Sequence, residues 1–278
     1  MTASSSDLAA PEPISAVRHE PLRRTWLRNT WGDLVYVHWA VDPDLIQASL
    51  PDGVRVDTFD DRAYVSLIPF QMTDAMVRGL PAIPGVSNFA ETNVRTYVVD
   101  SKGHRAIGFF SLEAVALPIV AFARWLLGFP YVWSRMSIER SGGDRDGTRR
   151  YRTERRRWPR RPGATTELEV EIGQRIETPS DLDVFLSARW GTVAEWPRRS
   201  GRIWYHPVDH DEWTLFEARI LHLDDESISA AGLPRPDTEP IVRYALPVHA
   251  RFGRPQRVTS PRRGVSRPTG RARPDRSG

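Results

Sequence analysis

The sequence contains no cysteine and only one lysine, Lys102, in 278 residues. The lack of cysteine excludes disulfide bridges, thiolate nucleophiles and cysteine-ligated metal sites. The lack of further lysines leaves Lys102 and the N-terminal amine as the groups available to form an imine with a carbonyl compound. The chain therefore cannot use thiol chemistry, and only two amines are available for imine formation.

Long apolar segments are also missing. The longest apolar run, residues 114–123, is interrupted by Pro118 and followed by Arg124, so it is too short to span a bilayer. The first twenty residues lack the apolar centre of a secretory signal peptide. We therefore predict a cytoplasmic protein that does not associate with a membrane.

Positive charge is concentrated at the C-terminal end. Residues 251–278 contain nine arginines and one acid, Asp275, and carry +8, whereas the whole chain carries +4. The first 250 residues therefore carry the difference, −4. The composition of residues 259–278, rich in Pro, Gly, Ser and Arg, is typical of disorder, and we expect disorder in residues 1–21 as well. Any nucleic-acid binding should be weak and should come from this C-terminal tail.

The segment between these ends, residues 22–258, has the pattern of a single β-rich domain. Alternating polar and apolar residues indicate roughly ten strands, and signals at Asp42, Pro118 and Ser180 indicate the starts of short helices. An arginine-rich stretch, residues 140–161, has turn residues at its centre and favours a solvated hairpin. These elements predict an α+β fold, mainly β, with one highly curved antiparallel sheet or barrel that encloses a cavity.

One hairpin, residues 91–113, combines many polar side chains with little charge on its second strand. Its sequence is ETNVRTYVVDSKGHRAIGFFSLE. The DSKG segment favours a type I turn followed by a Gly bulge, with Asp100 opposite His104. Counting outward from this turn puts three pairs on one face: Glu91 with Glu113, Asn93 with Ser111, and Arg95 with Phe109. We expect this polar face to line the enclosed cavity.

This register gives the polar face a chemical interpretation. Glu91 and Glu113 would lie close enough for the pKa of one carboxyl group to rise, which makes them candidates for a catalytic acid and base. Arg95 would hold an anionic or carbonyl-containing ligand, with Asn93 and Ser111 as further ligand contacts. A slip of one residue would turn Glu113 to the opposite face, and a buried polar network without a ligand is the alternative.

Several segments of the sequence resemble the YqjF-like family, which is similar to acetoacetate decarboxylase. They follow one another within residues 22–258 and include VHWAVDPDLIQASLPDGVRVDTFDDRAYVSLIPFQM, NFAETNVRTYV, GFFSLEA, ARWLLGFPYVWSRMS and DHDEWTLFEARILHL. The resemblance implies the acetoacetate decarboxylase-like fold, a β-barrel-like sheet around a cavity, in agreement with the strand pattern. It implies no reaction, because the family carries no established activity.

The resemblance to acetoacetate decarboxylase bears on one kind of chemistry. In that enzyme a GFPKK-like segment supplies the imine-forming lysine and a second lysine beside it. The matching segment here is GFPYV, which has Tyr131 and Val132 at those positions. An imine-forming amine must be neutral, which requires burial or nearby positive charge, and Lys102 is expected in an exposed turn. We therefore expect no Schiff-base chemistry, and Tyr131 either donates a hydrogen bond into the cavity or forms part of its aromatic wall.

Two groups of histidines carry weaker patterns. His206, Asp209 and His210 have only a loose metal-ligand spacing, and Pro207 among them predicts a turn, so we expect no metal site. His38 lies in an expected strand beside aromatic residues and is either a structural histidine or a contact to the ligand.

Two functional hypotheses follow from the sequence. No phosphate- or dinucleotide-binding motif is present, so no cofactor is expected. One of Arg155, Arg156 and Arg157 should point inward by strand alternation, and the pattern does not choose among them. The chain is either a small-molecule enzyme or binding protein that uses the cavity, or an accessory protein whose polar interior is structural. Association of several copies stays open in both hypotheses.

Overall fold

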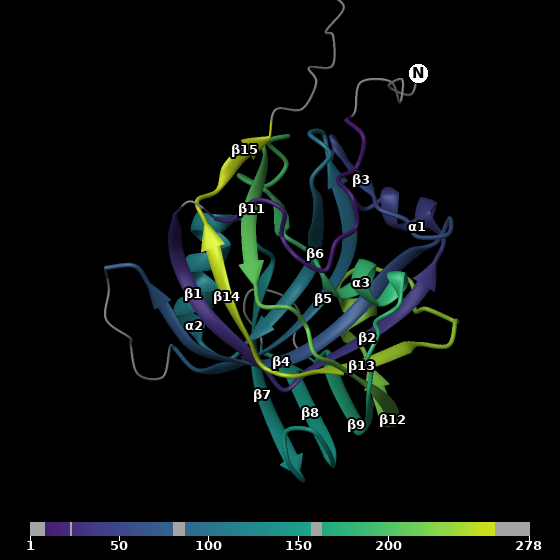
Figure 1. Ribbon diagram of the computed structural model, residues 1–278. Coiled ribbons are helices and arrows are strands. Elements are labelled where there is room, and N and C mark those ends of the chain that lie inside the picture. The colour runs from purple at the N-terminus through teal and green to yellow at the C-terminus, as the bar shows by residue number, and fades with distance from the viewer. Residues whose placement is uncertain (1–8, 23, 80–86, 157–162, 259–278) are drawn as a thin grey trace, which may run out of the picture.

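The computed structural model describes residues 9–22, 24–79, 87–156 and 163–258. The predictions for the tail, residues 259–278, and for Arg157 lie outside the described residues. The described part of the chain forms one large curved sheet with a few short helices (Figure 1), which confirms the expected α+β, mainly β fold. No helix in this described part is long and apolar enough to cross a membrane.

The strands of the sheet are, in chain order, β1 Thr25–Gly32, β2 Leu34–Val41, β3 Val54–Val56, β4 Ala63–Val77, β5 Phe89–Asp100, β6 Arg105–Ala114, β7 Tyr131–Ser141, β8 Thr148–Arg155, β9 Thr165–Arg175, β10 Gly191–Glu195, β11 Ile203–His210, β12 Leu215–Asp225, β13 Ile241–Ala245, β14 Val248–Gly253 and β15 Gln256–Val258. The helices are α1 Pro43–Gln47, α2 Leu117–Phe122, the π-helical turn η2 Ala123–Leu127, α3 Asp181–Ser187 and α4 Ser227–Ala230.

Local sequence signals place the helix ends. The Asp42 side chain accepts a hydrogen bond from the Asp44 N–H at the start of α1, and Ser180 and Asp183 form a capping box at the start of α3. Gly128 ends η2 with φ 76°, where a Cβ atom would lie 2.7 Å from the Trp196 Cβ. The starts at Asp42 and Ser180 agree with the sequence-based predictions.

The strand pairings close two circuits that share β4, β5 and β6. One circuit runs β4–β1–β14–β11–β10–β6–β5, and the other runs β4–β2–β13–β12–β9–β8–β7–β6–β5. Both circuits form because β4 pairs with β2 through its first half and with β1 through its second half. The pairs β6–β7 and β6–β10 are parallel and the other pairs are antiparallel, so the sheet is mainly of the antiparallel kind that the sequence predicted.

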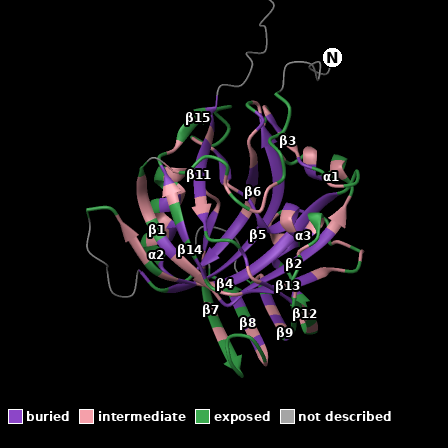
Figure 2. Cartoon of the chain, viewed as in Figure 1, coloured by how far each residue is buried: buried purple, intermediate pink, exposed green. Residues whose placement is uncertain are grey.

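The shared position of β5 explains its unusual composition. All twelve residues of β5 are buried, and Figure 2 shows the central strands β4, β5 and β6 as largely buried. Val94 on one face packs with Val35, Leu67 and Leu168 in the apolar core of the second circuit. The other face carries Glu91 and faces the first circuit. The expectation that the polar face of this strand is enclosed is therefore confirmed.

The register of the β5–β6 hairpin agrees with the prediction only near its turn. Asp100 donates its N–H to the His104 carbonyl oxygen over 3.1 Å, and the Cα partners match as far as Arg95 and Phe109. A β-bulge follows, because Phe110 has no partner on β5. Relative to the predicted register, every residue of β6 beyond the bulge is displaced by one position. Its side chain therefore points to the opposite face of the sheet from the predicted one.

One further expectation differs from the structure. Pro207 lies inside β11, opposite Gly191, and does not form a turn. The disorder expected for residues 1–21 stays a prediction, and of these residues 9–21 lie within the described part of the chain. Within them Arg18 donates hydrogen bonds to the carbonyl oxygens of Trp190 and Val208, over 2.6 and 2.7 Å. Side-chain hydrogen bonds between segments about 170 residues apart are not visible in local composition.

Candidate functional site

The first circuit encloses a cavity of about 110 Å³, which we call the inner chamber. A water-sized sphere requires about 10–15 Å³ of such space, so the inner chamber accommodates a small organic molecule. It is lined by Trp31, Leu34, Tyr36, Ile68, Phe70, Met72, Glu91, Asn93, Arg95, Ile107, Phe109, Leu112, Phe129, Tyr131, Ser187, Arg189, Thr192, Val208, His210, Trp213 and Phe252. Most of the wall is apolar, so the few polar groups determine which ligand fits.

A carboxyl group and a phenol meet at one end of the inner chamber. The Tyr131 hydroxyl donates a hydrogen bond to Glu91 Oε2 over 2.7 Å. Tyr131 is the first residue of β7 and lies beside Leu112 of β6, which brings it next to Glu91 of β5. Tyr131 therefore lines the inner chamber with its ring and donates its hydroxyl to Glu91, which leaves both of its sequence interpretations open.

Burial controls the protonation of this pair. It raises the pKa of Glu91 to about 8, although hydrogen bonds from Tyr131 and Asn93 act in the opposite direction and the charge of Glu113 adds a small increase. Burial also raises the pKa of Tyr131 well above its usual range. At neutral pH Glu91 is therefore mainly a protonated acid, held by a neutral phenol.

Arg95 brings a positive charge into the inner chamber. Its side chain is 7% exposed and no carboxylate oxygen of the described residues lies within 4.0 Å of it. Its Nη2 donates long hydrogen bonds to the Tyr97 hydroxyl and the Leu186 carbonyl oxygen, and its Cζ lies 5.4 Å from the centre of the Tyr36 ring. A buried charge without a counter-ion costs several kcal/mol, so this one requires an explanation.

Unpaired polar atoms concentrate around the same cavity. The lining residues contribute five buried side-chain atoms that have no hydrogen-bond partner among the described residues: Trp31 Nε1, Asn93 Oδ1, Arg95 Nε, Arg189 Nη2 and Thr192 Oγ1. Each such atom costs about 1–3 kcal/mol when it stays unpaired. Four of the five are donors or can donate, which suits a ligand that carries oxygen acceptors.

The two arginines of the inner chamber differ in their partners. Arg189 donates from Nη1 to Asp57 Oδ2 over 2.6 Å, so a carboxylate lies beside its charge, although Asp57 also pairs with Arg105. The charge of Arg95 has no such partner among the described residues, and Glu91 contributes no negative charge while it is protonated. At neutral pH the inner chamber therefore carries a net positive charge.

The bulge removes two predicted residues from this site. Glu113 lies opposite Thr92, and Ser111 opposite Val94, so both point away from the inner chamber. The predicted cross-strand pair of Glu91 and Glu113 is therefore wrong. The pKa of Glu91 rises all the same, mainly because the group is buried.

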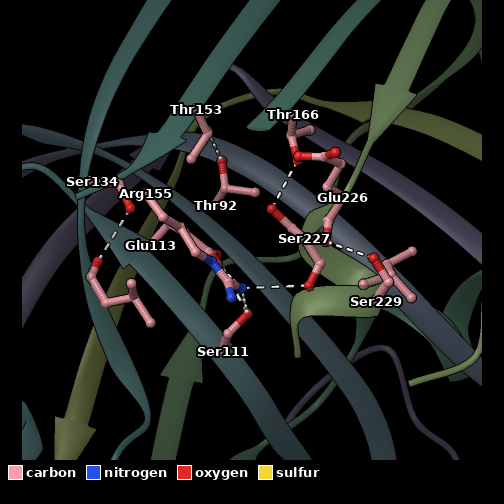
Figure 3. A network of polar contacts seen from close by, with 12 residues as sticks. Thr92, Ser111, Glu113, Ser134, Thr153, Arg155, Thr166, Glu226, Ser227 and Ser229 are labelled. Atoms are coloured by element: carbon pink, nitrogen blue, oxygen red, sulfur yellow. Dashed lines mark hydrogen bonds and ion pairs between the residues drawn. The ribbon is translucent and has the colours of Figure 1, made fainter. Parts of the chain in front are cut away.

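Glu113 belongs instead to an ion pair on the opposite face of the sheet (Figure 3). Arg155 of β8 donates from Nε to Glu113 Oε1 over 2.7 Å and from Nη2 to Ser111 Oγ over 3.1 Å. A longer bond joins Arg155 to the Ser227 carbonyl oxygen. Of the two described arginines of this stretch, Arg155 points inward, whereas Arg156 is exposed and lies over the Trp133 ring.

The histidines occupy structural positions. His38 does not line the inner chamber. It stacks on Tyr36 and its Nδ1 lies 2.7 Å from Ser66 Oγ. His210 does line the chamber, and burial lowers its pKa to about 4, so it is neutral there. Asp209, considered with His206 and His210 as a loose metal-ligand set, pairs with Arg251 over 3.0 Å.

Sequence reasoning missed several residues of the inner chamber. Arg189 and Thr192 come from the segment around β10, and Trp31 comes from β1. Each is distant in sequence from Arg95, and no local spacing connects them. Only the closure of the first circuit brings these residues together.

The raised pKa of Glu91 predicts a pH-dependent stability. The native state keeps this proton up to about pH 8, whereas the unfolded chain releases it near pH 4.5, so the stability conferred by protonation is lost as the pH rises between these values. The loss is at most about 1.4 kcal/mol per pH unit. Glu91→Gln keeps an acceptor for Tyr131 and removes the titration. Urea unfolding at pH 5, 6.5 and 8 should show that the variant gains stability relative to the parent as the pH rises. Parallel curves for the two proteins would contradict the assignment.

The fold of this chain is similar to that of acetoacetate decarboxylase-like structures. An acetoacetate decarboxylase-like enzyme from Sphingomonas wittichii RW1 is similar with a TM-score of 0.60 and 16% identity, over 87% of this chain and 96% of that one. The enduracididine biosynthesis enzyme MppR, solved in complex with pyruvate, is similar with a TM-score of 0.59 and 14% identity, over 85% of this chain and 91% of that one. At these identities the likeness concerns the fold.

The sequence itself establishes the family. Residues 28–249 match the model of DUF2071, described as an uncharacterized conserved protein (COG2071), and the chain belongs to this family. The uncharacterized protein YqjF of Bacillus subtilis (strain 168) is 30% identical over 219 residues, which cover 79% of this chain and 87% of that protein. The family resemblance identified from the sequence segments is therefore confirmed.

Proposed function

We propose that the inner chamber binds a small organic anion that also carries a carbonyl group, such as a 2-oxo or 3-oxo acid. The observation that supports this proposal most strongly is Arg95, a buried guanidinium group without a carboxylate partner among the described residues. A ligand carboxylate would supply the missing counter-charge through two parallel hydrogen bonds. The volume of about 110 Å³ limits the ligand to a small molecule.

The two ends of the polar face suit different parts of such a ligand. Glu91 and Arg95 are four residues apart on β5, which separates their Cα atoms by roughly 13 Å. Arg95 would hold the carboxylate, while the protonated Glu91 would donate to the carbonyl oxygen. With a pKa of about 8, Glu91 can also give or take a proton near neutral pH. Asn93 lies between them on the same face, and its unpaired Oδ1 would accept a hydrogen bond only from a ligand that also carries a donor.

This proposal excludes imine chemistry. Tyr131 and Val132 stand where the lysines of the GFPKK-like segment would be, and Lys102 is exposed at the tip of the β5–β6 turn.

The expected cytoplasmic location and the weak nucleic-acid binding by residues 259–278 stay predictions.

Calorimetric titration tests the proposed binding, and borohydride trapping tests the exclusion of an imine. Calorimetry should detect binding of pyruvate and acetoacetate but not of acetone, which lacks the carboxylate. Affinity should fall as the pH rises through about 8, because ionised Glu91 repels the anion. Borohydride reduction of the mixture should leave the intact mass unchanged. Equal binding of acetone would contradict the role of the charge, and a stoichiometric adduct at Lys102 would contradict the exclusion of an imine. Absence of binding by both acids would favour the accessory protein with a structural interior.

A further inference from the structure

A second hollow, of about 660 Å³, lies outside the inner chamber, and we call it the outer cleft. One wall is formed by η2 and the segment that follows it, including Arg124, Trp125 and Phe129. The opposite wall is formed by the end of β10 and the turn after it, including Trp196, Arg198 and Arg199. The Trp196 indole N–H donates to the Trp125 carbonyl oxygen over 3.0 Å, which ties the two walls together.

The outer cleft carries unbalanced positive charge. Its lining includes three arginines, Arg124, Arg198 and Arg199, and one acid, Glu195, whose Oε1 accepts a hydrogen bond from the Gly201 N–H. Within the described residues no carboxylate oxygen lies within 4.0 Å of these three arginines. Arg124 is held in place by donation to the Tyr131 carbonyl oxygen over 2.8 Å. Burial, and after it the charge of Arg198, lower the pKa of Arg124.

Aromatic surface lies beside these charges. Trp125 is 72% exposed although it is among the largest apolar side chains, and Trp196 forms the facing wall. An exposed indole ring offers a flat face on which a ring system can stack. Each guanidinium group can donate two parallel hydrogen bonds to phosphate oxygens. The phosphate groups of one ligand offer more oxygens to three arginines than a single carboxylate does.

From this arrangement we propose that the outer cleft binds an organic phosphate that carries a flat ring system, of the nucleoside diphosphate class. The phosphates lie between Arg124, Arg198 and Arg199, and the ring stacks on Trp125. The site adjoins the inner chamber, with which it shares the rings of Phe109 and Phe129, 5.8 Å apart and nearly perpendicular. None of its three arginines and neither of its tryptophans lines the inner chamber, so the proposal goes beyond the proposed function and does not depend on it.

The experiment compares three probes by calorimetry at low salt: ADP, pyrophosphate and adenosine. ADP should bind at least tenfold more tightly than either of the others, because only ADP engages both the arginines and the indole. The double variant Arg198→Gln/Arg199→Gln should weaken ADP and pyrophosphate by about tenfold or more. Trp125→Ala should weaken ADP by about tenfold and leave pyrophosphate unchanged.

A matched control separates a site from general attraction. Arg202 is exposed, close in sequence and outside the lining of the cleft, so Arg202→Gln removes a neighbouring charge without touching the site. ADP affinity should be unchanged in this variant. If Arg202→Gln weakens ADP as much per arginine as the double variant does, the attraction is non-specific and the proposal is wrong. ADP binding that is no tighter than that of pyrophosphate overturns the stacking on Trp125. The altered side chains are on the surface, so thermal unfolding of all variants should match that of the parent.

Discussion

Replacing Arg95 with methionine should abolish the binding of pyruvate and at the same time raise the free energy of unfolding. The guanidinium group supplies the positive charge that the ligand carboxylate would meet, and loss of one partner of a buried charged contact costs about 2–5 kcal/mol, or at least thirtyfold in affinity. In the free protein the same charge is buried without a carboxylate among the described residues, and an apolar side chain of similar length removes that cost. The contacts of Arg95 with the Tyr36 and Tyr97 rings reduce the gain, so we expect about 1 kcal/mol.

Calorimetric titration and urea unfolding measure the two effects of Arg95→Met. The pyruvate affinity of Arg95→Lys should lie between those of the parent and Arg95→Met, because lysine keeps the charge and loses the paired hydrogen bonds. Arg135→Met, at an exposed arginine of β7, is the matched control and should leave both measurements unchanged. If Arg95→Met loses several kcal/mol of stability, Arg95 serves the core, and the accessory-protein hypothesis becomes the better one.

Breaking the ion pair of Glu113 and Arg155 should lower the free energy of unfolding, in contrast to Arg95→Met. Both side chains are almost fully buried, so Arg155→Met leaves the Glu113 carboxylate without its partner. We expect a loss of about 3–5 kcal/mol in the free energy of unfolding, because breaking a buried pair on one side strands a charge. The double variant Glu113→Leu/Arg155→Met should recover most of this loss, since both charges are then absent.

Urea unfolding compares the parent, Glu113→Leu, Arg155→Met and the double variant. Arg152→Met is the control, because Arg152 pairs with Glu139 and Glu167 at the surface and should cost less than about 1 kcal/mol. A loss for Arg155→Met as small as that of the control would mean that water reaches Glu113, and the structural role of the pair would be refuted. Pyruvate binding should survive in the double variant, since the pair lies on the face turned away from the inner chamber.

The β-bulge at Phe110 separates what was predictable at this site from what was not. The turn residues Asp100 and Gly103 determine the hairpin next to the turn, because their conformations depend on neighbouring residues alone. The bulge lies farther along β6, between Gly108, the last residue paired with β10, and Leu112, the first paired with β7. The change of partner strand along that edge is a property of the whole sheet, so the face of Glu113 could not be derived from the hairpin sequence.

Composition and local pattern alone determined several properties of this protein. They established the absence of thiol chemistry, the helix caps at Asp42 and Ser180, and the enclosed polar face of β5. Each of these follows from residue identity or from interactions within a few positions along the chain.

Only the tertiary structure decided which polar groups share a cavity. It placed Arg189 and Thr192 beside Arg95, paired Arg155 with Glu113, and left the charge of Arg95 without a carboxylate among the described residues. The physical reason is that burial and charge pairing depend on segments about 40 to 100 residues apart in the chain, which the closing of two strand circuits brings into contact.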